Sequence, residues 1–242
     1  MKHKTWKYMI VASIALLIAG CGSNTKKQTK EKTGQDNASV AIDRIKTLQL
    51  DGVQVTWIQD NAGEHFMPRT IFPDASDALI DSLSLQNGIP ASISTFLVET
   101  NGIRILFDTG IGAPDSRLLI GLKSLGIEPA DIKYLYLTHF HGDHIGGMMK
   151  GDSAVFPNAE IYASQTEYNA WLKMPADKNA QVVKTMNAYK SRLHLFEFGD
   201  TLPGNIITMN AVGHTPGHTV FQAGKLLVIG DLIHGAAFQM EH

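Results

Sequence analysis

Only one of the 242 residues is a cysteine, Cys21, which excludes an internal disulfide and a cysteine-based zinc cluster. Charge is also scarce: 18% of the residues are charged, with 21 Lys and Arg against 23 Asp and Glu. Binding to a nucleic-acid backbone needs a clear basic excess, so this balance argues against nucleic acid as a partner. The hydrophobic content of 44% is ordinary for a globular domain and excludes a disordered chain. Ten histidines, by contrast, are many.

The N-terminal apolar run is too short for a typical transmembrane helix. It spans the thirteen residues 8–20, and at about 1.5 Å per residue it falls short of the ~30 Å hydrocarbon core. Basic residues precede it and Ile18-Ala19-Gly20-Cys21 ends it, so residues 1–21 are typical of a secretory signal whose end resembles a bacterial lipobox. We expect an exported lipoprotein, acylated on Cys21 (for example with palmitate), with its domain on the extracytoplasmic side of a membrane. An ordinary signal peptide with a chance cysteine is the alternative.

The next segment, residues 22–38, has no large apolar side chain, and we expect it to be a flexible tether. Removal of residues 1–20 would take three lysines and no acids from the chain, which leaves 18 basic residues of the 21 against 23 acidic ones. The exported form is therefore mildly acidic, a further point against nucleic acid. Residues 39–242 form the predicted domain.

That domain alternates between strand-like and helix-like patterns. Asn101-Gly102 separates the apolar stretches 92–100 and 103–107, which predicts a hairpin with a type I′ turn. Sheets and helices in one core indicate a layered α/β domain. Further strands are predicted at 53–58, 134–137, 159–163, 193–198, 206–212, 220–223 and 226–229, and helices at 75–83, 116–125, 165–172 and 180–190.

A histidine cluster follows the short predicted strand at 134–137. Four candidate metal ligands fall within the six residues 139–144: His139, His141, Asp143 and His144. A single buried histidine is usually an ordinary core residue, but three of them beside a carboxylate would compete for few hydrogen-bond partners without a cation. Imidazole nitrogens and a carboxylate suit zinc or another divalent first-row metal.

Two more candidate ligands each follow a later strand. The strand at 206–212 leads into Gly213-His214-Thr215-Pro216-Gly217-His218, and the strand at 226–229 leads into Gly230-Asp231. Loops that leave strands at one edge of a sheet project their side chains into a shared cleft. Asp231 alone would be an ordinary turn or cap residue, but in this company it is favoured as a ligand.

In this order and spacing, these strings resemble the metallo-β-lactamase-fold hydrolases, and Leu106-Phe107-Asp108-Thr109-Gly110 is a strand end typical of them. Residues 230–239 are most similar to the branch that contains methyl parathion hydrolase-like and quorum-quenching lactonase enzymes. The resemblance implies a four-layered αβ/βα sandwich with two metal ions at the edge of two facing sheets. The implied ligands are His139, His141 and His214 for the first ion, Asp143 and His144 for the second, and Asp231 between them.

The metal that the resemblance implies is Zn²⁺, with Mn²⁺, Fe²⁺ or Co²⁺ as alternatives. The sequence departs from the family at one point: the family supplies a further histidine to the second ion from well beyond the bridging aspartate, whereas this sequence ends eleven residues after Asp231. We therefore expect a domain that is incomplete at its C-terminus. His234 and His242 lie downstream, but neither has the setting expected of the missing ligand.

The implied chemistry is hydrolysis of a small ester, lactone or organophosphate by a hydroxide that bridges the two ions. Asp143 would orient this hydroxide and relay a proton, while Asp108 and His218 are candidates to support the ligands from behind. Two alternatives stay open: a non-catalytic or weakly active metal-binding protein, because the distal histidine is absent, and a glyoxalase II-like thioester hydrolase, which shares the 213–218 string. The expected partners are a small-molecule substrate and the membrane, with a homodimer left open.

Overall fold

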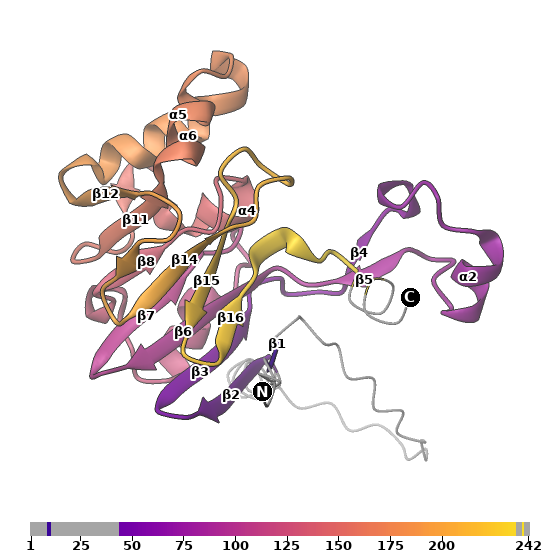
Figure 1. The fold of residues 1–242 in the computed structure, drawn as a ribbon, viewed down its shortest axis with the longest axis horizontal. Helices are drawn as coiled ribbons and strands as arrows, with labels where there is room; N and C mark the ends of the chain where they lie inside the picture. Colours follow the sequence, from indigo (N-terminus) through magenta and orange to yellow (C-terminus); the bar gives the residue numbers. More distant parts are fainter. Residues whose placement is uncertain (1–8, 11–43, 236–238, 240–242) are drawn as a thin grey trace, which may run out of the picture.

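The computed structural model describes residues 9–10, 44–235 and 239. Most of the predicted signal, the lipid attachment at Cys21, the predicted tether and His242 lie outside the described residues. The described chain forms two facing sheets with helices beside them, and a smaller extension that projects to one side (Figure 1). Among the described helices, none has both the length and the apolar character needed to cross a bilayer.

The larger sheet is antiparallel in one half and parallel in the other. The parallel pairs put the carboxyl ends of neighbouring strands at the same edge, where the histidine cluster begins. In spatial order its seven strands are Leu193–Phe196 (β12), Glu160–Ser164 (β11), Tyr134–Tyr136 (β8), Ile103–Phe107 (β7), Ser94–Thr100 (β6), Val53–Gln59 (β3) and Ile45–Leu50 (β2).

The predicted hairpin with a two-residue turn is confirmed. Strands β6 and β7 pair antiparallel around Asn101 and Gly102, whose φ angles of 50° and 73° are the left-handed values that a type I′ turn requires. This register puts Leu97 opposite Leu106, and both side chains are buried on the helix-covered face of the sheet. The turn therefore also decides which face each strand residue presents.

The smaller sheet is mostly an antiparallel meander. In spatial order its strands are Met9–Ile10 (β1), Leu226–Val228 (β16), Thr219–Ala223 (β15), Ile206–Asn210 (β14) and Thr201–Leu202 (β13), with β1 parallel to β16. Two further strand pairs stand apart: Met149–Lys150 (β9) with Ser153–Ala154 (β10), and His65–Met67 (β4) with Ile89–Ala91 (β5).

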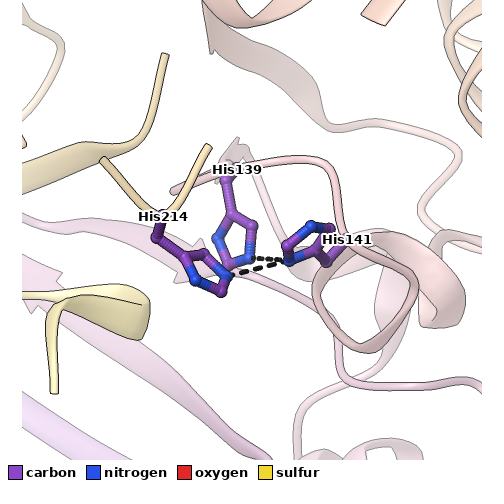
Figure 2. A group of neighbouring side chains, drawn as sticks. All are labelled: His139, His141 and His214. Atoms are coloured by element: carbon purple, nitrogen blue, oxygen red, sulfur yellow. Dashed lines mark hydrogen bonds between the residues drawn. The ribbon is translucent and has the colours of Figure 1, made fainter. Parts of the chain in front are cut away.

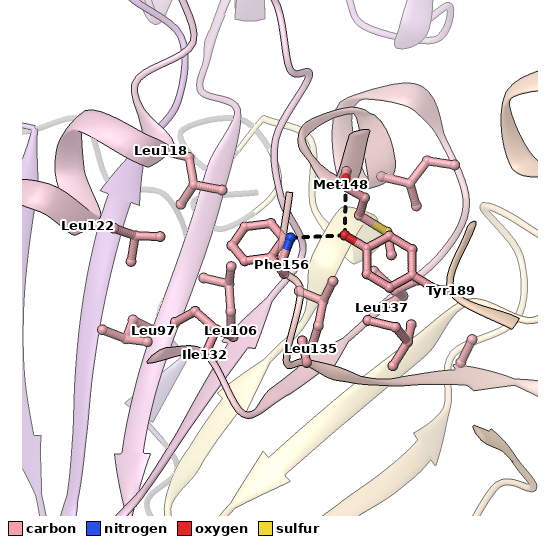
Figure 3. Close-up of a cluster of buried hydrophobic side chains, with 14 of the residues drawn as sticks. Leu97, Leu106, Leu118, Leu122, Ile132, Leu135, Leu137, Met148, Phe156 and Tyr189 are labelled. Carbon is pink, nitrogen blue, oxygen red and sulfur yellow. Dashed lines mark hydrogen bonds between the residues drawn. The ribbon is translucent and has the colours of Figure 1, made fainter. Parts of the chain in front are cut away.

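Helices cover the outer face of the larger sheet, and their bounds are Leu118–Ser124 (α3), Gly142–Ile145 (α4), Gln165–Leu172 (α5) and Ala176–Ala188 (α6). Helix α2 (Asp77–Ser82) lies in the extension with β4 and β5 (Figure 1). Beneath the covering helices lies an apolar core in which Tyr189 is fully buried (Figure 3). Its hydroxyl donates to the carbonyl of Met148 at 2.8 Å and accepts from the N–H of Phe156 at 3.1 Å, so no polar atom of its side chain is left unpaired.

A second core joins the two sheets. Phe107 of β7, Tyr136 of β8 and Phe221 of β15 form a ring cluster with centroid separations of 5.3–5.7 Å. Such aromatic contacts stabilise packing beyond the area that they bury. The Tyr136 hydroxyl donates to the carbonyl of Pro203 at 2.8 Å. Because β7 and β8 both end beside the histidine cluster, this core sets the spacing between the sheets next to the site.

Helices, larger sheet and smaller sheet are three layers of the predicted four-layered αβ/βα sandwich. On the outer face of the smaller sheet, Ile207 and Met209 of β14 are 38% and 41% exposed. No helix within the described residues covers this face. The described residues therefore contain three of the four predicted layers, and the fourth layer stays a prediction.

Candidate metal centre

The predicted ligands come together from three strand ends. His139 and His141 follow β8, His214 follows β14, and Asp231 follows β16. These strands belong to both sheets, so the site lies where the two sheets meet at one edge. From His139 to Asp231 these residues span 92 positions of the chain, and the fold brings them into overlapping groups of ligand atoms.

Three imidazoles form the first group (Figure 2). The Nδ1 atom of His141 lies 3.0 Å from Nε2 of His139 and 2.9 Å from Nε2 of His214. Three ring nitrogens that converge in this way are a donor set that zinc takes in proteins. The predicted grouping of these histidines is what the structure shows, while their role as metal ligands stays a prediction.

A second group contains His139, His144 and Asp231. The Oδ1 atom of Asp231 lies 3.1 Å from Nε2 of His144, and its Oδ2 atom lies 3.3 Å from Nε2 of His214. This carboxylate therefore contacts histidines of both groups. That Asp231 bridges two cations stays a prediction.

Behind His144, Asp108 accepts three hydrogen bonds. Its Oδ2 atom lies 2.8 Å from Nδ1 of His144 and 2.7 Å from the Thr138 hydroxyl, and its Oδ1 atom accepts from the Thr138 N–H at 2.9 Å. With its Nδ1 proton directed at Asp108, His144 turns Nε2 toward the centre, which is how outer carboxylates orient histidine ligands. The structure thus puts Asp108 where a supporting residue was predicted.

His218 supports the site differently. It is fully buried, and its Nε2 atom accepts from the backbone N–H of Asp231 at 3.1 Å. Its Nδ1 atom has no hydrogen-bond partner among the described residues. Gly230 has φ of 51°, and a Cβ there would lie 2.7 Å from the His218 ring. The Gly-Asp string therefore lets the Asp231 backbone approach His218 closely.

Asp143 lies at the rim of the site rather than within a tight group. Its Oδ2 atom is 3.8 Å from Nε2 of His144, and its side chain is 41% exposed. It belongs to none of the ligand groups found within the described residues. Beside it opens a cleft of about 130 Å³ that Met67, Pro90 and Phe96 also line, so the unpredicted strands β4 and β5 contribute to its wall.

His234 lies beside the predicted ligands, although the sequence pattern does not favour it as one of them. Its Nε2 atom lies 3.3 Å from Oδ2 of Asp231, and it forms a third group with Asp231 and His214. Its spacing of three residues after Asp231 is the only signal of this in the sequence. The structure therefore places one of the two downstream histidines beside the predicted ligands, while His242 lies outside the described residues.

Comparison with known proteins agrees with this geometry. The Metallo-beta-lactamase superfamily matches residues 88–240, which contain all of the side chains above from Phe96 to His234. The chain belongs to this superfamily. Both the predicted family and the predicted fold class are thereby confirmed.

Within the superfamily, the chain is similar to lactonases. The N-acyl homoserine lactonase AttM of Azorhizobium caulinodans is 28% identical over 144 residues, which cover 53% of this chain and 50% of that protein. An N-acyl homoserine lactonase of Bacillus thuringiensis is 32% identical over 122 residues, or 48% and 45% of the two chains. The chain spans about half the length of the curated relatives it matches.

Two solved structures share the fold over a larger part of the chain. The hydrolase AbOPH of the β-lactamase superfamily has a TM-score of 0.68 and 31% identity, over 78% of this chain and 74% of that one. AidC, a dizinc quorum-quenching lactonase, has a TM-score of 0.67 and 28% identity, over 78% and 75%. Both agree with the predicted class of metal-dependent hydrolase.

Burial and neighbouring charges shift the pKa values of the site residues in different directions. Burial lowers the pKa of His139 and lowers that of His214 to about 4, so both rings are neutral near pH 7 and keep the lone pair that a metal requires. Burial also opposes a charge on His144, but Asp108 and Asp231 outweigh it and raise the pKa of His144. Burial would raise the pKa of Asp231, but its hydrogen bonds to His144 and His234 lower it. The pocket thus favours negative charge on Asp231, as a cation site needs.

Proposed function

We propose that this protein is a dinuclear zinc hydrolase of small lactones and esters, with organophosphates as further substrates. One observation carries the proposal: Asp231 contacts histidines of two ligand groups, so a single carboxylate can serve two cations. The residues that would hold them are His139, His141 and His214 for the first, Asp143 and His144 for the second, and Asp231 for both. These nitrogen and oxygen donors suit Zn²⁺, and Mn²⁺, Fe²⁺ or Co²⁺ would also be accommodated.

Bound zinc and the side chains of the protein would share the steps of the reaction. A bound zinc pair supplies a nucleophile near neutral pH and polarises the carbonyl of the substrate. Asp143, at the mouth of the site, would accept the proton of the attacking water and return it to the leaving alcohol. Met67 and Phe96 provide apolar surface in the cleft, where the acyl part of a substrate can pack.

The comparisons support this substrate class through the names of similar proteins. Two curated relatives are called N-acyl homoserine lactonases, and a structural neighbour is described as a dizinc lactonase with N-hexanoyl-homoserine as its product. An N-acyl homoserine lactone combines an ester ring with an apolar chain, which matches a polar metal-ligand cluster beside a partly apolar cleft.

A substrate panel tests the proposal. The zinc-loaded chain should bind about two ions and open N-hexanoyl-homoserine lactone, with slower turnover of an aryl ester and a phosphotriester. Metal content is measured by mass spectrometry. Ring opening is measured by titrating, at constant pH, the carboxylic acid that it produces. The same chain treated with a chelator is the control. Zinc-loaded protein that is inert toward every lactone, ester, thioester and phosphotriester would identify a metal-binding protein without catalysis.

We also propose that the mature protein is anchored to a membrane on its extracytoplasmic side through lipid on Cys21. The support is the lipobox-like string 18–21 after a basic, apolar leader. Cells fed labelled palmitate should incorporate label into the wild-type protein and none into Cys21→Ser. Equal labelling of both proteins would exclude the anchor, without bearing on hydrolysis.

A further inference from the structure

A buried carboxylate outside the ligand groups contacts two of the site's loops at once. Glu167, in the first turn of α5, is 1% exposed. Its Oε1 atom accepts from the backbone N–H of Phe140 at 3.0 Å and from the Trp171 indole N–H at 2.7 Å. Its Oε2 atom accepts from the backbone N–H of Gly217 at 2.7 Å. No Lys or Arg within the described residues forms an ion pair with it.

These backbone partners sit among the predicted ligands. Phe140 lies between His139 and His141 in the loop after β8, which belongs to the larger sheet. Gly217 lies in the loop after β14, three residues beyond His214, and this strand belongs to the smaller sheet. One carboxylate therefore links the backbones of two loops that come from different sheets.

Close packing around Glu167 also holds the two loops together. A Cβ on Gly217 would lie 2.2 Å from the backbone nitrogen of Glu167, so only glycine lets this loop rest against the start of α5. The Trp171 ring, held by Glu167, packs edge-on against His141 with ring centroids 5.7 Å apart. Glu167 thus also orients the side chain behind one of the three converging imidazoles.

We propose that Glu167 is a positioning residue that sets the separation of the two loops carrying the first ligand group. The inference rests on the proposed function, because the group it positions is the predicted site of the first zinc ion. His139 and His141 are on one loop and His214 is on the other, so their nitrogens converge only while the loops stay in register. A buried carboxylate that accepts from three N–H groups forms strong hydrogen bonds, because the local dielectric is low. Loss of any one of these hydrogen bonds leaves a buried polar group unpaired.

Glu167→Gln breaks the link with little change of shape. The amide oxygen can accept from only one side, so the amide nitrogen then faces an N–H group of the other loop. We expect the dissociation constant for the first zinc or cobalt ion to rise about 10- to 100-fold, the effect of losing an outer-shell partner. Trp171→Phe removes one donor to Glu167 but leaves both loop contacts, so we expect a smaller rise in the dissociation constant than for Glu167→Gln.

Asn179→Ala is the matched control. Asn179 is a buried polar residue of α6 whose amide donates to the carbonyls of Trp171 and Met174 and forms no hydrogen bond with the part of either loop that the structure describes. Asn179→Ala should lower the melting temperature of the metal-free protein and leave the metal affinity of the folded protein unchanged. Glu167→Gln with wild-type affinity would overturn the inference and leave the proposed function intact.

A metal-free measurement separates the inference from the proposed function. Hydrogen–deuterium exchange of the full chain without metal should speed up in peptides that cover 138–144 and 213–219 together in Glu167→Gln, and in neither of them in Asn179→Ala. Unchanged exchange in both peptides would overturn the positioning role. If the wild type failed to bind zinc, the proposed function would fall, while the exchange result would still decide whether Glu167 holds the loops.

Discussion

Replacing Asp231 with asparagine is expected to weaken metal binding at both proposed sites and to lower kcat/KM for lactone opening by about 10³-fold, the upper range for the loss of one charge-stabilising group. The carboxylate contacts His144 through one oxygen and His214 and His234 through the other. An amide keeps the shape but offers one neutral oxygen, so two cations would lose a shared charged ligand.

The measurement is zinc per chain after dialysis, followed by lactone turnover at saturating zinc. Metal content should fall from about two ions to one or fewer. Asp177→Asn, at an exposed position on α6, changes the same chemical group outside the ligand groups and should retain both ions and activity. Full metal content and turnover in Asp231→Asn would show that this carboxylate is not the bridge.

The elements next to the site could be predicted from sequence because their signals are local. The Asn101-Gly102 turn dictates its own φ angles, and the strand at 134–137 is a short apolar run that ends at a histidine string. The edge strand β2 has no such signal, since the residues between its two ends are exposed. Strands β4 and β5 are three residues each, too short for any periodicity to show.

The roles of Glu167 and His234 could not be predicted, for a different reason. Glu167 occupies the first turn of a helix, where a glutamate is ordinary, and its partners lie 27 and 50 residues away along the chain. His234 follows Asp231 by only three residues, whereas the family resemblance directs attention to a histidine much farther on. Glu167 is recognised only through tertiary contacts that no local pattern encodes, and His234 only through the contact that Asp231 also makes with the distant His214.

Asp108→Asn is expected to weaken binding of the second ion about 10- to 100-fold, the usual effect of removing an outer-shell carboxylate. The backbone should tolerate the change, since Asp108 has φ of 58° and asparagine is among the residues that adopt this conformation. The expected loss comes from proton placement. With its oxygen retained by the Thr138 N–H, the new amide group donates to Nδ1 of His144. That ring must then carry its proton on Nε2, the atom that would bind the metal.

Metal titration of the folded variant measures this effect, and another buried carboxylate provides its control. Asp60 is fully buried and accepts from the N–H groups of Ile111, Arg117 and Leu118 without contacting a site histidine. Asp60→Asn should therefore lower the melting temperature and leave the zinc affinity of the folded protein as it was. Asp108→Asn should instead reduce the second binding step selectively, and a mutant that bound both ions with wild-type affinity would show that the His144 tautomer does not control the site.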